Sequence, residues 1–299
     1  MGAKAIIVDF CGVITYRVLR VMIEKKQINV GAVEETLFIP LLMRWKDAES
    51  PKPILGDRVA LDIAQQMDFN WEKYGGWNKM SYYGCLVRAK YCDQEVVTLA
   101  KAPVPDTLLL VNAGCGLDTR WHRTIQTLSS YRRIDLDLEP VISLRNEVMP
   151  PLDGVQSLAG DLTSPNFITE LQSLTTAETQ VILVIEGVLM YFTDREIREL
   201  MDRLYGAFGD RLLIVCDMLN STVVKHQKQH DTIRHSEACF RSGYDSIAEV
   251  EGLHPHLRVL HRRSVLDMMK PYTFIARIGA LIPSLRWNTT IYTLDFKKA

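Results

Sequence analysis

A glycine turn follows an apolar run in residues 107–123, TLLLVNAGCGLDTRWHR. The apolar run is typical of a strand covered on both faces. Gly114 and Gly116 would let the backbone after that strand approach a nucleotide-like ligand closely. A dinucleotide fingerprint also needs a third glycine for close helix–strand packing, and Thr119 stands at that position. The turn therefore predicts a ligand-binding loop and weakens the interpretation of an NAD site.

Acidic residues end the next three expected strands: Asp135 and Asp137, then Asp161, then Glu186. The carboxyl ends of parallel strands form the ligand-binding edge of an open α/β sheet. Asp135 and Asp137 lie about twenty positions beyond Gly116, where a carboxylate can accept both hydroxyls of a ribose. Asp161 can accept from the exocyclic amine of an adenine, and Glu186 can pair with a cationic amine. Considered alone, Glu186 could equally be a capping or salt-bridged surface carboxylate.

The order of the segments NAGCGLDTR, RIDLD, AGDL and EGVLMYF resembles the leucine carboxyl methyltransferase family, which includes tetracenomycin-type polyketide O-methyltransferases. The resemblance covers residues 34–192 well and the remainder loosely. It implies an α/β, class I methyltransferase fold, which is Rossmann-like with a seven-stranded, mostly parallel sheet. It also implies S-adenosylmethionine as the cofactor. The residues that it assigns to cofactor binding are Arg88, Gly114, Gly116, Asp137, Asp161, Leu162 and Glu186.

Arg88 is assigned through the run RAKYCD, in which Asp93 stands behind it, and the alternative is a solvated helix arginine. Asp118 and Thr119 match the aspartate and threonine of the family's turn. We expect them to hold the loop by side-chain-to-backbone hydrogen bonds. Cys115 is expected to be a small buried hydrophobic residue, since no partnered base that would make it a nucleophile is visible.

Two regions of the chain are expected to complete the site. Residues 1–102 predict a mainly helical N-terminal extension that contributes to the cofactor site, ending at the prolines of residues 102–105. Residues 103–299 alternate strands and helices, which is typical of a doubly wound parallel sheet. Residues 288–298 suit a final edge strand, and residues 217–270 predict an inserted substrate cover.

The candidates for a catalytic role are Tyr191, His226 and His230. The two histidines are spaced like a helical metal pair, but the central Glu of a metalloprotease helix and a third ligand are missing, so no metal is expected. With Lys225, Arg234 and Arg241 they could instead form a basic cover that recognises an anionic acceptor. A solvated polar helix is the alternative.

The predicted reaction is S-adenosylmethionine-dependent O-methylation of a carboxylate on a small molecule. A carboxylate is ionised at neutral pH, whereas a phenol or alcohol acceptor would want a general base. The alternatives are methylation of a protein's C-terminal leucine, a non-catalytic cofactor-binding regulatory subunit, and an NAD-dependent oxidoreductase. Residues 5–15, AIIVDFCGVIT, also resemble the first strand of a haloacid-dehalogenase-type phosphatase, but Cys11 stands where its general acid would be, two after Asp9.

Composition sets limits on partners and location. The chain has 299 residues and a formal net charge of −1, which gives no indication of binding to nucleic acid or an anionic membrane. Six cysteines without a C-x-x-C pair are typical of reduced thiols, so the cytoplasm is expected and a zinc cluster is not. The apolar N-terminal run is interrupted by Asp9, and neither a secretory signal nor a membrane span is expected. The sequence leaves the acceptor's identity and the oligomeric state open.

Overall fold

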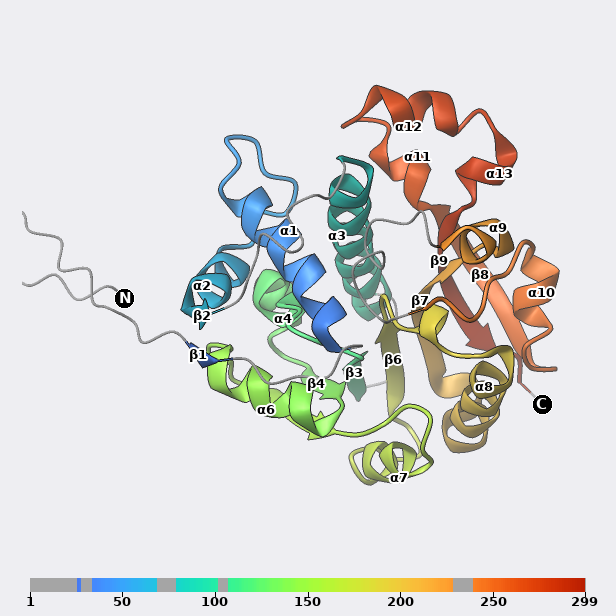
Figure 1. Cartoon of the computed structure of the whole chain (residues 1–299). Helices are drawn as coiled ribbons and strands as arrows, with labels where there is room; N and C mark the ends of the chain where they lie inside the picture. The colour runs from blue at the N-terminus through green and yellow to red at the C-terminus, as the bar shows by residue number, and fades with distance from the viewer. Residues whose placement is uncertain (1–25, 28–33, 69–78, 102–106, 228–238, 299) are drawn as a thin grey trace, which may run out of the picture.

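The computed structural model describes residues 26–27, 34–68, 79–101, 107–227 and 239–298. Its centre is a seven-stranded sheet with the order β5-β4-β3-β6-β7-β9-β8 (Figure 1). The strands are β3 (Leu108–Ala113), β4 (Arg132–Asp137), β5 (Val155–Ala159), β6 (Gln180–Ile185), β7 (Leu212–Leu219), β8 (Leu257–Ser264) and β9 (Thr289–Phe296). The first five pair in parallel, and β9 is antiparallel to both β7 and β8. The predicted fold class is thus confirmed.

Helices cover both faces of the sheet. One face is covered by α7 (Asn166–Ser173) and α8 (Asp194–Phe208), and the other by α3 (Lys79–Lys101), α4 (Arg120–Arg123), α5 (Ile125–Leu128), α11 (Val265–Met269) and α12 (Phe274–Gly279). Strands β3 and β6 are almost wholly buried because they are apolar runs packed on both faces. The sheet therefore forms a rigid layer whose carboxyl ends position the loops that follow.

A third cluster of helices packs beside the glycine turn. It joins α1 (Phe38–Ala48) and α2 (Arg58–Gln66) to α6 (Glu139–Val148) through buried apolar side chains. Leu117 of the turn belongs to the same cluster, so this packing fixes the turn from the side opposite the sheet. A short parallel pair, β1 (Lys26–Gln27) with β2 (Met67–Asp68), lies next to it. The other short elements are η1 (Glu34–Leu37), η3 (Leu189–Tyr191), η4 (Gly209–Arg211), α9 (Ser221–Lys225), α10 (Ile247–Glu251) and α13 (Pro283–Arg286).

The expectation of a final edge strand is wrong. Strand β9 lies inside the sheet, between β7 and β8, and β8 is the edge. The sequence of β8, LRVLHRRS, does not read as a strand because four of its five exposed positions are basic: Arg258, His261, Arg262 and Arg263. Such polar outward positions are expected of a strand with one solvated face. The predicted cover thus includes a strand of the main sheet.

Several expectations fall outside the described residues: the proline break at residues 102–105, the phosphatase-like Asp9 and Cys11, and His230 and Arg234 of the cover. Among the described helices, none combines the length and the apolarity that crossing a bilayer requires.

Candidate functional site

A cavity of about 510 Å³ opens at the carboxyl ends of β3, β4 and β6, between α1, α3 and α11. All residues predicted to bind the cofactor line it: Arg88, Gly114, Gly116, Asp137, Asp161, Leu162 and Glu186. They come from α3, from the turn after β3, and from the ends of β4, β5 and β6. The fold therefore brings residues that lie up to 98 positions apart in the sequence into one wall of the cavity.

The glycine turn forms a narrow cradle in this wall. Gly114 and Gly116 have φ angles of 64° and 48°, in the left-handed region that favours glycine. A Cβ atom at Gly114 would lie 2.3 Å from Cγ2 of Val188, so a side chain there would clash with the loop after β6. The Gly116 N–H donates to Oδ2 of Asp137 at 2.7 Å, which holds the turn against the end of β4.

The two acidic strand ends next to the turn are anchored by their own loops. Oδ1 of Asp137 accepts from the Leu138 N–H at 2.8 Å. Oδ1 of Asp161 accepts from both the N–H and the hydroxyl of Thr163, at 2.8 and 2.7 Å. Each carboxylate is thus fixed in orientation while it lines the cavity.

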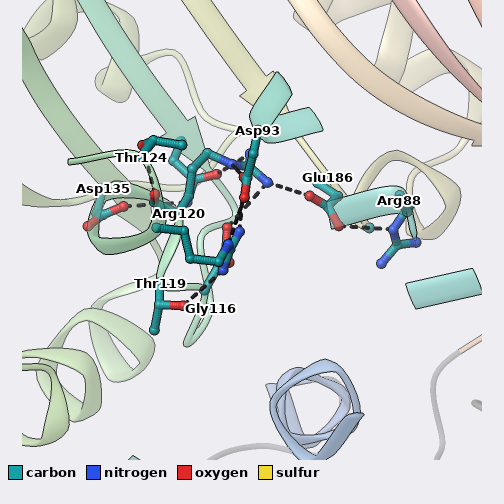
Figure 2. A network of polar contacts seen from close by, with 12 residues as sticks. Arg88, Asp93, Gly116, Thr119, Arg120, Thr124, Asp135 and Glu186 are labelled. Carbon is teal, nitrogen blue, oxygen red and sulfur yellow. Dashed lines mark hydrogen bonds and ion pairs between the residues drawn. The ribbon is translucent and has the colours of Figure 1, made fainter. Parts of the chain in front are cut away.

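Glu186 lies between two arginines (Figure 2). Its Oε1 accepts from Nε of Arg88 at 3.0 Å, and its Oε2 pairs with the guanidinium of Arg120. Nη1 of Arg88 also donates to Asp217 at 3.0 Å. The alternative that Arg88 is a solvated helix arginine is wrong, because its side chain is only 15% exposed and binds two carboxylates.

A second group of ion pairs supports the cavity wall, and Asp118 of this group also lines the cavity. Asp93 pairs with Arg120 at 3.0 Å and with Arg123 at 2.7 Å, so it supports the glycine-turn helix rather than Arg88 itself. Asp118 pairs with Arg123 at 2.7 Å and with Arg120 at 3.2 Å. The expectation that Asp118 and Thr119 hold the loop by hydrogen bonds to the backbone is therefore wrong: Asp118 forms ion pairs, and the Thr119 hydroxyl donates to Asp57 and accepts from Arg123 at 2.8 Å.

The electrostatics of this group follow from burial and close opposite charges. Burial alone would raise the pKa of Asp118, but Arg123, Arg120 and Arg44 hold it well below its usual value. Burial would lower the pKa of Arg120, but Asp118, Glu186 and Asp93 raise it. Burial raises the pKa of Asp217, and the Arg88 guanidinium opposes that rise. Arg88 is therefore the largest of the influences that favour the ionised form of Asp217, ahead of the hydrogen bond from the Gly187 N–H.

Sequence reasoning missed Asp217 and Arg44. Asp217 could have been found, since it is the single acidic residue of the apolar strand LLIVCDML. Arg44 carries no comparable signal. It lies on α1, donates to the Leu117 carbonyl at 2.9 Å, and pairs with Asp57 at 3.3 Å, so only the tertiary structure shows its contact with the turn.

The other half of the cavity is largely apolar. It is lined by Met80, Gly84 and Cys85 of α3, Met190 and Tyr191 of η3, Leu219, Phe240, and Val265, Leu266 and Met269 of α11. We call this half the apolar chamber. A Cβ atom at Gly84 would lie 3.8 Å from Sδ of Met269 and 3.9 Å from Cγ1 of Val265. Helix α3 therefore approaches α11 closely at Gly84, next to the side chains of Val265 and Met269 that line the chamber.

Of the described candidate catalytic residues, one lines the cavity and the other does not. Tyr191 lines the cavity, and its ring packs 5.8 Å from that of Phe240. Burial raises the pKa of its phenol, and a hydrogen bond with Thr36 opposes the rise. His226 is exposed, with Nδ1 2.9 Å from the Thr222 carbonyl, and does not line the cavity. The described residues also contain no cluster of ligands that could hold a metal.

Part of the expected cover contacts this site. The Arg241 N–H donates to the Met190 carbonyl at 2.7 Å, and the Arg241 guanidinium pairs with Glu196 at 3.3 Å. Cys115 is buried, and burial raises the pKa of its thiol well above the usual value, as expected of a buried hydrophobic residue.

Comparison with known proteins identifies the family to which the chain belongs. A model of the leucine carboxyl methyltransferase family matches residues 37–205, more than half of the chain. The chain belongs to the leucine carboxyl methyltransferase family. As a member of this family it is an S-adenosylmethionine-dependent methyltransferase, and the prediction made from the motifs is confirmed.

Two relatives and two solved structures support this placement. The chain is 24% identical over 288 residues to the tetracenomycin polyketide synthesis O-methyltransferase TcmP of Streptomyces glaucescens, covering 90% of this chain and 98% of that protein. It is 28% identical over 202 residues to the S-adenosyl-L-methionine-dependent methyltransferase dpfgK of Gibberella zeae, covering 63% and 65%. A candidate methyltransferase of Thermobifida fusca superposes with a TM-score of 0.56 at 14% identity, covering 86% of this chain and 94% of that one. A DUF574-family protein of Streptomyces avermitilis gives 0.55 at 11% identity, with 86% and 97% covered. At these identities the solved structures show the same fold.

The cavity wall fits the cofactor of this family. Glycine at position 114 lets the loop after β6 pack directly against the turn, and carboxylates that follow β4, β5 and β6 line the cavity beside it. An amino acid head group with an amine and a carboxylate needs an anion and a cation, and Glu186 and Arg88 supply both within 3.0 Å of each other.

Proposed function

We propose that this enzyme transfers the methyl group to a carboxylate oxygen of a small, largely apolar molecule. The name of the relative TcmP, an O-methyltransferase of polyketide synthesis, supports an oxygen acceptor on a small molecule. The observation that carries the proposal is the composition of the apolar chamber. Among its described residues, the titratable side chains are the Cys85 thiol and the Tyr191 phenol.

Neither group is suited to act as a general base. Burial raises the pKa of the Cys85 thiol and of the Tyr191 phenol, so both are protonated at neutral pH. Along the described lining of the chamber, an alcohol would therefore find no group to accept its proton. A carboxylate is already ionised, so the enzyme needs only to orient it and to exclude water. The proposed acceptor is therefore an anion on an apolar body.

The cofactor would bind to the wall of the cavity that faces the apolar chamber. This wall carries the residues that the sequence predicts for cofactor binding. Arg88 would bind its carboxylate and Glu186 its amine, while Gly114 and Gly116 approach it through the backbone. Asp137 would accept the ribose hydroxyls, and Asp161 and Leu162 would contact the adenine. When bound, this cofactor supplies a methyl group on a sulfonium, which is already activated for displacement. The chain's contribution is then to hold the acceptor in line.

The cysteines support a reducing compartment. Cys85, Cys92, Cys115, Cys216 and Cys239 are all free in the described part of the chain. We therefore propose the cytoplasm as the location.

The proposal is tested in two steps with the full chain. Calorimetric titration with S-adenosylmethionine and S-adenosylhomocysteine should give one site per chain. Transfer of labelled methyl groups is then measured to a panel of apolar carboxylic acids, matched alcohols and phenols, and peptides ending in leucine. We expect label in the acids, released as methanol by mild base because the product is an ester.

Each other outcome contradicts a part of the proposal. Base-stable label in alcohols or phenols would show that the acceptor is not a carboxylate. Label in the leucine peptides would favour a protein acceptor. Cofactor binding without transfer to any acceptor would favour the regulatory subunit.

A further inference from the structure

An apolar surface lies on the outside of the last two helices. Six exposed side chains form it, on and between α12 and α13: Phe274, Ile275, Ile278, Leu281, Ile282 and Leu285. We call them the α12–α13 patch. Phe274 is 69% exposed and Leu281 is 80% exposed, although both are large apolar side chains. Figure 1 shows α12 and α13 at the outer edge of the molecule, beyond α11.

The patch is the outer face of a packed segment. Its inner side chains, Ala276 and Ala280, are buried in the same core cluster as Val265 and Leu266 of α11. A Cβ atom at Gly279 would lie 3.2 Å from Cδ2 of Leu266, so the backbone of α12 approaches α11 closely. The apolar outer face is therefore held in place by a fixed inner face. Concentrated exposed apolar area of this kind marks an interaction surface.

The charges around the patch are mostly positive. Its cations are Arg262, Lys270, Arg277 and Arg286, and the sequence has no Asp or Glu between Asp267 and Asp295. Lys270 and Arg286 both pair with Asp267, at 2.5 and 2.7 Å, so one carboxylate serves two of these four cations. Arg262 lies over the ring of Trp287 at 4.1 Å, which places a cation beside an aromatic ring next to α13. This local excess of positive charge cannot be seen in the net charge of the whole chain, which is −1.

We propose that the α12–α13 patch docks this enzyme onto an anionic lipid surface. Segments that lie in a membrane interface combine an apolar face with lysine, arginine and tryptophan, and anionic headgroups attract the cations. A second copy of the chain fits less well, because a two-fold interface would bring the patch and its cations against themselves. This inference is independent of the methyl acceptor.

The test is co-sedimentation of the full chain with phosphatidylcholine vesicles, with and without phosphatidylserine. We expect binding to the phosphatidylserine vesicles that weakens as salt is raised, and little binding to neutral ones. The double variant Phe274→Ser, Leu281→Ser and the variant Arg277→Glu should each reduce the bound fraction about tenfold. The matched controls Leu260→Ser and Arg195→Glu change an exposed leucine and an exposed arginine outside the patch, and should bind as the parent does.

Three results would overturn the proposal. Equal binding by patch variants and controls would show that the patch is not the contact. Absence of vesicle binding together with a dimer that Leu281→Ser dissociates in sedimentation would assign the patch to a second copy. Absence of vesicle binding by a chain that stays monomeric in sedimentation would show that the patch binds no lipid surface. In all arms, unchanged binding of S-adenosylhomocysteine confirms that the variants are folded.

Discussion

The guanidinium of Arg88 and the carboxylate of Glu186 lie 98 positions apart in sequence and form an ion pair of 3.0 Å in the cavity wall. This contact joins the middle of α3 to the exit of β6. Arg88 is also bound by Asp217, which is fully buried on β7. One arginine thus stabilises a buried carboxylate and, in our proposal, binds the cofactor.

These two roles of Arg88 can be separated by a pair of variants. Arg88→Ala should weaken S-adenosylhomocysteine binding by about 1.5–3 kcal/mol, the value of a hydrogen bond to a charged group. It should also destabilise the fold, since Asp217 loses its cation. The double variant Arg88→Ala, Asp217→Asn should recover most of the stability and none of the affinity. Calorimetric titration and thermal unfolding measure both quantities on the same samples.

Affinity that returns together with stability in the double variant would contradict the role of Arg88 in binding. The loss in Arg88→Ala would then be a consequence of partial unfolding.

The cradle at Gly114 is tested by Gly114→Ala. Its Cβ would meet Cγ2 of Val188 at 2.3 Å, so the loop after β6 must move and the cavity wall must change. We expect cofactor affinity to fall by more than about tenfold, with a loss of stability above about 1 kcal/mol. Gly56→Ala is the matched control, because Gly56 has a similar φ of 65° but its Cβ would meet Pro53 only at 3.6 Å. It should lose stability and keep affinity, and equal losses of affinity in the two variants would exclude a steric role.

Much of the site could be predicted because most of its residues directly follow strands that the sequence itself indicates. The carboxyl ends of parallel strands lie at the same edge of a sheet, regardless of how the rest of the chain folds. The residues at these ends are Gly114, Gly116, Asp137 and Glu186. Arg88 required the resemblance to a known family, since its position on a helix says nothing about which sheet edge it reaches. Their roles in binding stay predictions.

The parts that could not be predicted depend on contacts between distant segments. Arg44 touches the glycine turn only because α1 packs beside it, 73 positions away. Strand β8 was missed because its exposed face breaks the apolar pattern, and β9 was therefore placed at the edge. The apolar chamber depends on where α11 meets α3, which no motif encodes.

Acid should weaken the second group of ion pairs through Asp118. Its pKa in the fold lies well below the ordinary value of 3.8, so ionised Asp118 stabilises the fold above 3.8, and this contribution is lost as the pH falls through the lowered pKa. Asp118→Asn should cost about 1.5–3 kcal/mol near pH 7, because Arg120 and Arg123 each lose one of the carboxylates that bind them and keep Asp93. Urea unfolding of both proteins at a series of pH values measures the difference. A gap that does not narrow below about pH 4 would contradict this role.

Tyr191→Phe distinguishes a carboxylate acceptor from one that needs a base. General acid–base catalysis contributes about 100-fold or more, whereas removing a phenol that only packs should change kcat less than about threefold. We expect the small change with a carboxylate acceptor, since the pKa of Tyr191 is raised by burial and its phenol stays protonated. A loss of two orders of magnitude with intact cofactor affinity would identify Tyr191 as the base, and the acceptor would then be an alcohol or phenol.

The size of the acceptor should depend on Gly84. A Cβ here makes ordinary contacts with Met269 and Val265, at 3.8 and 3.9 Å, so Gly84→Ala should be tolerated and stabilise α3 by about 0.5–1 kcal/mol. The larger side chain of Gly84→Leu should displace Met269 and Val265, which line the chamber. We expect it to raise the KM for the acceptor about tenfold or more and to leave S-adenosylhomocysteine affinity unchanged. The matched control is Gly206, inside α8, where a Cβ would meet nothing within 4 Å. Gly206→Ala and Gly206→Leu should affect stability alone, and a Gly84→Leu enzyme with an unchanged KM would show that the acceptor does not enter this part of the chamber.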